Sequence, residues 1–139
     1  WAVHLGGGVN HRFGLYDMIL IKDNHVDAAG GIENAIERAN EYLKQTGKKL
    51  KIEIETRSLE EVNRVLKTGK VDRIMLDNFT PALLKEAIEL IDKRYETEAS
   101  GGITIETIRS FAESGVDFIS VGALTHSHKS LDISMKIVK

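Results

Sequence analysis

The sequence contains no cysteine, and this absence excludes several kinds of chemistry. Without thiols the chain forms no disulfide bonds, has no thiolate nucleophile and offers no cysteine ligand to a structural zinc ion. It also lacks any apolar run near the roughly 18 residues that span a bilayer. These absences leave the compartment open but fit the cytoplasm, which is the location that we expect.

Neither sign of charge is in excess, since the 139 residues carry a formal net charge of −2 at pH 7. A general affinity for nucleic acid or for anionic membranes is therefore not expected. Hydrophobic residues make up 42% of the chain and charged residues 29%, a balance that supports a globular core and argues against disorder. A chain of this length corresponds to one domain or to part of one.

Short apolar or alternating runs recur along the chain, with helical patterns between them. The runs predict strands over residues 18–21, 50–55, 73–77, 95–99 and 118–121. The patterns between them predict one helix that ends at residue 5 and others over 32–45, 58–68, 81–92 and 104–114. A capping box from Ser58 to Glu61 opens the helix at 58–68, and Thr80 caps the helix at 81–92. Residues 23–25 are interpreted as a loop, and the tail 131–138 as helix rather than strand. We expect an α/β fold, an incomplete and open β/α barrel of parallel strands, because five units are too few to close an eight-stranded barrel.

The two faces of the predicted strands differ in character. One face is aliphatic and fits a contact with helices: Ile52, Ile54, Ile74 and Leu76. Four carboxylates then point to the barrel interior: Glu53, Glu55, Asp77 and Glu98. Buried carboxylates require cations or a metal, and the possible partners are Lys22, Lys51 and Arg73. An interior salt-bridge network is the alternative to a functional site, and Glu53, deep in its strand, is assigned to that structural class.

Basic groups gather in residues 6–25, around the apolar run 18–21. Lys22 directly follows that run, so its ammonium lies at the carboxyl end of the predicted strand, where open sheets and barrels place their active sites. Arg12 stands beside His11 in a glycine-flanked loop and offers a planar fork that binds a carboxylate. The pattern favours an anionic substrate, and an ordinary solvated lysine beside a plain turn is the alternative.

Two glycine-containing loops follow the last predicted strands. They consist of Ser100, Gly101 and Gly102, and, one unit later, of Val121, Gly122 and Ala123. Backbone N–H groups in such loops approach anions closely, so the pair predicts a shared phosphate site, with simple turns as the alternative. His126 and His128 make only a weak metal pair, and no structural zinc is expected.

Five motifs connect these features to a known family. The string GGGVNHRFGLYDMILIKDNH comes first, and KIEIE, MLDNF, EASGGIT and SVGALTHS follow in that order. Over about residues 5–136 the chain closely resembles quinolinate phosphoribosyltransferase, the carboxylating nicotinate-nucleotide pyrophosphorylase of NAD synthesis. The resemblance covers the later part of that family's chain, without its amino-terminal domain and its TRKT motif. Because the chain also starts at Trp1 with no signal peptide, we expect residues 1–139 to be the C-terminal barrel portion of a longer or processed protein.

The resemblance implies a reaction and a role for each motif. The family joins quinolinate to phosphoribosyl pyrophosphate and releases CO2 and pyrophosphate, which gives nicotinate mononucleotide. By motif, the quinolinate ligands would be His11, Arg12 and Lys22. Glu55 and Asp77 would hold the ribose and are the candidates for placing the Mg²⁺ that accompanies the pyrophosphate, while the two glycine loops would hold the 5′-phosphate. An incomplete α/β barrel that assembles as a homodimer or a larger homo-oligomer is implied as well.

Two other functions stay open. A homologous barrel that acts on another aromatic acid fits the same scaffold. A non-catalytic phosphate-binding barrel would bind a sugar phosphate without turnover.

Overall fold

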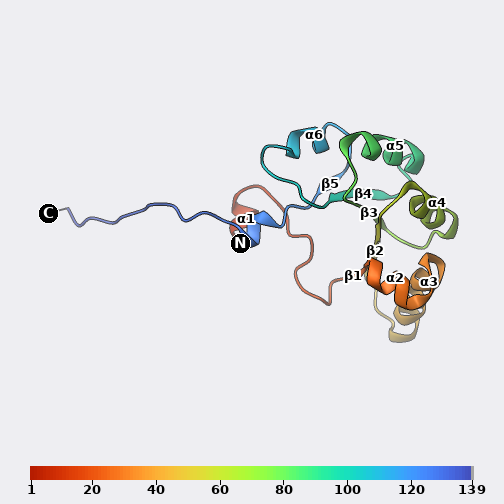
Figure 1. Cartoon of the computed structure of the whole chain (residues 1–139). Coiled ribbons are helices and arrows are strands. Elements are labelled where there is room, and N and C mark those ends of the chain that lie inside the picture. The colour runs from red at the N-terminus through yellow and green to blue at the C-terminus, as the bar shows by residue number, and fades with distance from the viewer. Residues whose placement is uncertain (139) are drawn as a thin grey trace.

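A parallel sheet organises the computed structural model, which describes residues 1–138 (Figure 1). Its five strands lie in the order β1-β2-β3-β4-β5, and every neighbouring pair is parallel. The elements along the chain are α1 (Ala2–Leu5), β1 (Met18–Ile21), α2 (Asp23–Ala29), α3 (Ile32–Thr46), β2 (Lys51–Thr56), α4 (Leu59–Thr68), β3 (Arg73–Asp77), α5 (Pro81–Ile91), β4 (Glu96–Ser100), α6 (Ile108–Ala112), β5 (Phe118–Ile119) and α7 (Ala123–His126). Within the described residues the sheet does not close, because β1 and β5 are its edges. The prediction of an open β/α barrel is confirmed.

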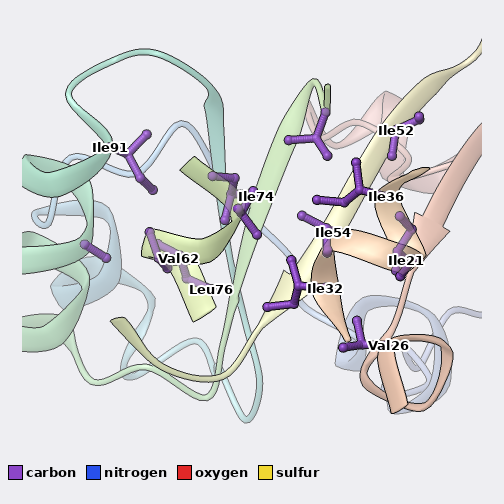
Figure 2. Packing of buried hydrophobic residues seen from close by; sticks show 14 of the residues in the cluster. Ile21, Val26, Ile32, Ile36, Ile52, Ile54, Val62, Ile74, Leu76 and Ile91 are labelled. Carbon is purple, nitrogen blue, oxygen red and sulfur yellow. The ribbon is translucent and has the colours of Figure 1, made fainter. Parts of the chain in front are cut away.

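The outer face of the sheet, defined by Ile52, Ile54, Ile74 and Leu76, carries the hydrophobic core (Figure 2). These four side chains are at most 2% exposed, as the alternation along the strands predicts. Helices α3, α4 and α5 cover them with further buried residues: Ile32, Ile36, Val62, Val65, Leu84 and Ile91. Burial of one such side chain contributes ~1.5–3 kcal/mol, so this face is the main source of stability.

Side-chain caps fix where two of the covering helices begin. The hydroxyl of Ser58 accepts the backbone N–H of Glu61 at 3.2 Å, and the hydroxyl of Thr80 accepts that of Leu83 at 3.3 Å. Both starts agree with the sequence prediction. The carboxylate of Glu61, however, accepts the N–H of Arg57 at 2.7 Å, one residue before the cap, so the reciprocal half of the predicted capping box is shifted.

Residues 23–25 open helix α2, so the loop predicted there is wrong. The backbone N–H of Lys22 donates to Nδ1 of His25 at 3.0 Å, which satisfies one of the free groups at the helix start. Val26 and Ala29 are buried in the core, and α2 lies against α3. Asp and Asn occur both in turns and at helix starts, and the burial of this apolar face is what selects the helix.

The elements after β4 are shorter than predicted. Helix α6 begins at Ile108 rather than at residue 104, because the hydroxyl of Thr107 accepts the N–H of Thr104 at 3.0 Å and stabilises a turn. Strand β5 contains two residues instead of four, and only Phe118 and Ile119 pair with β4.

Residues 127–138 form neither helix nor strand, so the tail helix predicted for 131–138 is wrong. In Figure 1 this segment extends away from the sheet and its helices. Leu131 and Ile133 are 80% and 81% exposed, and a short helix without an apolar contact is not stable in water. None of the helices in residues 1–138 is long and apolar enough to cross a membrane.

Candidate functional site

An open cavity of about 1100 Å³ covers the inner face of the sheet, at the carboxyl ends of its strands. Leu20, Arg73 and Met75, which alternate with the core residues along their strands, form its base. Most residues that the sequence predicted for the site line this cavity: His11, Lys22, Glu55, Asp77, Ser100, Gly101, Gly102, Val121, Gly122 and Ala123. Arg12 does not. The structure therefore brings together segments that lie far apart in the sequence, while the role of each residue stays a prediction.

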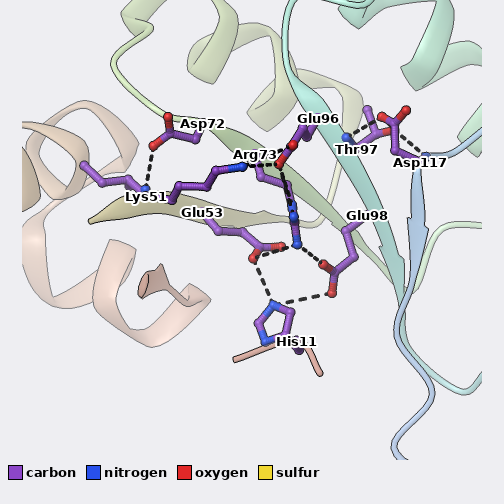
Figure 3. A network of polar contacts seen from close by, with 10 residues as sticks. His11, Lys51, Glu53, Asp72, Arg73, Glu96, Thr97, Glu98 and Asp117 are labelled. Carbon is purple, nitrogen blue, oxygen red and sulfur yellow. Dashed lines mark hydrogen bonds and ion pairs between the residues drawn. The ribbon is translucent and has the colours of Figure 1, made fainter. Parts of the chain in front are cut away.

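Arg73 connects three glutamates across the inner face (Figure 3). Its Nη1 donates to Glu98 at 2.9 Å and lies 3.9 Å from Glu53, and its Nε and Nη2 donate to Glu96 at 3.2 and 3.1 Å. The strand register explains these pairs, because Glu53 and Glu96 flank Arg73 directly in the sheet. The guanidinium also lies 4.0 Å from the ring centroid of Phe118. An interior salt-bridge network, the alternative left open by the sequence, is therefore present.

His11 extends this network from the loop before β1. Its Nε2 lies 2.9 Å from Oε2 of Glu53 and 3.5 Å from Oε1 of Glu98. The hydrogen bond to Glu53, helped by the negative charge of both glutamates, raises the pKa of His11 above its usual 6.5 against the opposing effect of burial. Burial in turn raises the pKa of Glu98, whose Oε1 also accepts a hydrogen bond from the hydroxyl of Ser120.

Three possible metal ligands meet at this point, since one atom each from His11, Glu53 and Glu98 lie within 4.8 Å of one another. Arg73 pairs with both carboxylates, and its fixed positive charge would repel a metal ion placed between them. We interpret these residues as an ion-pair cluster, not as a metal centre.

A second pair of carboxylates, Glu55 and Asp77, lies at the carboxyl ends of β2 and β3. Burial raises the pKa of Glu55, the negative charge of Asp77 raises it further, and the ammonium of Lys22 lowers it. Two carboxylates that repel each other are stabilised by a cation, and carboxylate oxygens are preferred ligands of Mg²⁺. These two residues fit the magnesium expected from the resemblance.

The two basic side chains near β1 differ in placement. Lys22 lines the cavity and forms no ion pair within residues 1–138, so its charge is available to a ligand. Arg12 lies outside the cavity, in a turn where the carboxylate of Asp17 accepts the N–H groups of Phe13 and Gly14 at 2.8 and 3.0 Å. The predicted binding of a carboxylate by Arg12 stays a prediction, without the support from cavity geometry that Lys22 has.

The two glycine loops meet in the cavity, but without the helix ends that the sequence suggested. Gly101 has a φ of +100°, and a Cβ there would lie 2.2 Å from Oδ1 of Asn78, so a side chain is excluded from this contact. Helix α6 begins six residues after Gly102, and α7 spans only Ala123–His126. Anion binding at these loops would therefore depend on backbone N–H groups rather than on a helix dipole.

Two residues of this region, His126 and Ser120, were not assigned to the site from the sequence. His126 lines the cavity from α7, with its Nδ1 2.7 Å from the hydroxyl of Ser127, although the sequence suggested it only as a metal ligand. Ser120 also lines the cavity, and its hydroxyl donates to Glu98, a carboxylate that the sequence had predicted to point to the barrel interior. The available signal was position, since Ser120 directly precedes the second glycine loop and His126 follows it within one turn.

The sequence of the chain is similar to those of known proteins. The family model for the C-terminal domain of quinolinate phosphoribosyl transferase matches residues 1–136. The chain is 54% identical to the chloroplastic nicotinate-nucleotide pyrophosphorylase (carboxylating) of Arabidopsis thaliana, over 99% of this chain and 43% of that protein. It is 46% identical to the probable nicotinate-nucleotide pyrophosphorylase of Bacillus subtilis, over 99% of this chain and 46% of that protein.

Solved structures give the same result. The crystal structure of NadC from Streptococcus pyogenes matches with a TM-score of 0.89 and 44% sequence identity, over 98% of this chain and 46% of that chain. The chain thus spans a little less than half the length of the relatives that it matches. The motifs, the open barrel and the family model agree, and the chain belongs to the quinolinate phosphoribosyl transferase family, in which it corresponds to the C-terminal domain.

Proposed function

We propose that this protein transfers the phosphoribosyl group of phosphoribosyl pyrophosphate to quinolinate with loss of CO2, giving nicotinate mononucleotide for NAD synthesis. The observation that carries the proposal is that one cavity holds the cationic groups of Lys22 and His11 together with the carboxylates of Glu55 and Asp77. Quinolinate has two carboxylates that a lysine and a protonated histidine bind well. The glycine loops in the same cavity offer backbone donors to a phosphate.

The reaction requires charge placement more than a protein nucleophile. The ring nitrogen of quinolinate forms a bond to the anomeric carbon while the bond to pyrophosphate breaks, and the leaving group keeps the electron pair. Positive charge develops on the ribose, where the carboxylates of Glu55 and Asp77 stabilise it. Departure of the 2-carboxylate as CO2 leaves an electron pair that the cationic ring accepts, and a proton from water takes the vacated position. The residues of the cavity bind and orient both substrates.

Magnesium is the cofactor that we propose, held with the pyrophosphate near Glu55 and Asp77. Support comes from the position of the two carboxylates: burial raises the pKa of Glu55, and the negative charge of Asp77 raises it further. When bound, the ion supplies positive charge that neutralises the departing pyrophosphate.

A homodimer or a larger homo-oligomer is the assembly that we propose. Apolar side chains of the first segment are strongly exposed, among them Trp1 at 86%, Phe13 at 83% and Leu15 at 87%. Exposed apolar groups of this density mark surfaces that a partner covers. Analytical ultracentrifugation of the complete protein measures the assembly, and a monomer at micromolar concentration would contradict the proposal.

The cytoplasmic location expected from the sequence is also a proposal. The lack of cysteine leaves the compartment open and fits this location, whereas the Arabidopsis relative is described as chloroplastic. Fractionation of the source cells decides between the two.

Release of labelled CO2 tests the proposed function. The complete protein is incubated with phosphoribosyl pyrophosphate, Mg²⁺ and quinolinate labelled in its 2-carboxylate, and both labelled CO2 and nicotinate mononucleotide are measured. Equal amounts of the two products are expected. Turnover of another aromatic acid but not of quinolinate would indicate a homologous barrel of different specificity. Binding of a sugar phosphate without any turnover would indicate a non-catalytic barrel.

A further inference from the structure

With all three of its glutamates ionised, the ion-pair cluster on the inner face is balanced in charge only when His11 is protonated. Three carboxylates, those of Glu53, Glu96 and Glu98, face two permanent cations, Arg73 and Lys51 (Figure 3). Glu53 and Glu98 are fully or almost fully buried, and Oε1 of Glu53 has no hydrogen-bond partner within residues 1–138. A buried carboxylate without full compensation is costly, so the cluster favours a third positive charge.

The two ring nitrogens of His11 have different surroundings. Nε2 faces the glutamates, 2.9 Å from Glu53 and 3.5 Å from Glu98. Within the described residues Nδ1 has no hydrogen-bond partner, and His11 lines the large cavity. When Nε2–H donates to Glu53, a neutral ring has only a lone pair at Nδ1, which repels an anion. A protonated ring has an N–H at both positions and donates to an anion in the cavity.

We propose that Glu53 and Glu98 are positioning residues that hold His11 as an imidazolium, so that its Nδ1–H binds one carboxylate of the dicarboxylate substrate. The inference rests on the proposed function, because it takes quinolinate as the ligand. It adds a purpose to two buried glutamates that the reaction itself does not use. One of them, Glu53, had been assigned from the sequence to a purely structural class.

Three neighbouring charged groups act directly on the protonation of His11. Glu53 on β2 and Glu98 on β4 favour the imidazolium, and Arg12, next to His11 in the loop, disfavours it. Arg73 on β3 pairs with both glutamates and partly neutralises their negative charge. Burial opposes protonation, but the hydrogen bond to Glu53 outweighs it, and the pKa of His11 is raised.

Three variants of the complete protein separate the positioning role from a general effect of lost charge. Glu53→Gln and Glu98→Gln each remove a carboxylate next to His11 and keep the shape of the side chain. Glu96→Gln is the matched control, because Glu96 also pairs with Arg73 but does not contact His11. Cooperative thermal unfolding checks that each variant is folded, and if Glu53→Gln does not fold, Glu98→Gln carries the test.

Protonation is measured without ligand by NMR of protein labelled with ¹⁵N-histidine, with the His11 signal identified by its loss in His11→Gln. We expect the titration midpoint of His11 to fall by about one pH unit or more in Glu53→Gln and Glu98→Gln, since a carboxylate within hydrogen-bonding distance shifts a pKa by roughly 1–3 units. Glu96→Gln should move it by much less. Calorimetric titration with quinolinate should show the same downward shift in the pH at which affinity is lost, with binding up to about tenfold weaker at pH values between the two midpoints.

Failure of this inference differs from failure of the proposed function. Retained quinolinate turnover with an unchanged His11 midpoint in both variants would overturn the positioning role alone. A midpoint that shifts while the pH dependence of quinolinate affinity does not would overturn the contact between Nδ1–H and the substrate. Absence of quinolinate binding and turnover in the unmodified complete protein would overturn the proposed function, and with it the identity of the ligand.

Discussion

The two faces of one sheet are built from alternate residues of the same strands, yet they have opposite characters. On the outer face Ile54 and Ile74 are fully buried beneath helices. On the inner face Glu53 and Arg73, their immediate neighbours in the chain, belong to a network of ion pairs beside an open cavity. Aliphatic burial has no directional requirement, whereas each charge of the inner face needs a partner at a set distance. The outer face therefore supplies stability, and the inner face supplies a defined arrangement of charges.

The largest effect is expected on the outer face. Ile54→Ala should lower the free energy of unfolding of the complete protein by ~2–5 kcal/mol, because it removes a fully buried side chain and leaves a cavity. Denaturant unfolding measures the loss, and Ile105→Ala, at a position that is 82% exposed, is the control with little expected change. A loss below about 1 kcal/mol in Ile54→Ala would contradict the view that this face carries the stability.

Asp77→Asn should show the reverse pattern, with lower activity and nearly unchanged stability. Asp77 is half-buried at the carboxyl end of β3 and lines the cavity. Loss of its charge should reduce turnover by roughly 10²-fold, the usual scale for one electrostatic group that acts on a transition state. Steady-state rates with both substrates and Mg²⁺ measure this effect. Near-normal turnover would show that the pair of carboxylates is not where charge is stabilised.

Lys22→Ala and Lys51→Ala together compare the carboxyl and amino ends of the strands, and Lys22 is the residue at the carboxyl end. Its ammonium lines the cavity, so its loss should weaken quinolinate binding by about 10- to 100-fold, from ~1.5–3 kcal/mol for a charge-assisted contact. Binding of phosphoribosyl pyrophosphate should change less. Lys51→Ala is the matched control, because Lys51 begins β2 and pairs with Glu96 away from the cavity. Calorimetric affinities that fall equally in both variants would remove the distinction between the strand ends.

The smallest effect is expected from the exposed pair that joins α3 to α4. Arg64 donates to Glu33 through two nitrogens, at 3.0 and 2.6 Å, and lowers the pKa of Glu33 to about 2. A lowered pKa in the folded state means that the stabilisation is present above the usual 4.5 and is lost as the pH falls toward about 2.

Solvent screening limits this contribution to about 0–1 kcal/mol, because the side chains are 41% and 52% exposed. Glu33→Gln should therefore flatten the pH dependence of unfolding between pH 4.5 and about 2 only slightly. Glu41→Gln, on the same helix, provides the baseline. A difference of several kcal/mol between the two variants would show that the surface contributes more than the comparison of the two faces allows.

Local patterns in the sequence determined the alternation of strands and helices, the open β/α barrel and the aliphatic outer face, because periodicity and caps depend on neighbours in the chain. Helix α2 and the short α6 were not predictable in this way, since burial of Val26 and Ala29 and the Thr104–Thr107 turn decided them. The short β5 was not predictable either, because its extent depends on pairing with β4. The predicted tail helix failed because residues 127–138 have no surface to pack against within the described chain.

The candidate site also has features that the sequence predicted and features that only the tertiary structure decided. The sequence identified Lys22, Glu55 and Asp77 as polar groups at strand ends, because parallel strands bring their carboxyl ends to one edge. Only the tertiary structure decided that His11 faces Glu53 and Glu98, that Arg73 joins the glutamates, and that Arg12 lies outside the cavity. Which charges meet depends on strand register and on the path of a loop, and residues separated by tens of positions in the chain carry no local signal of either.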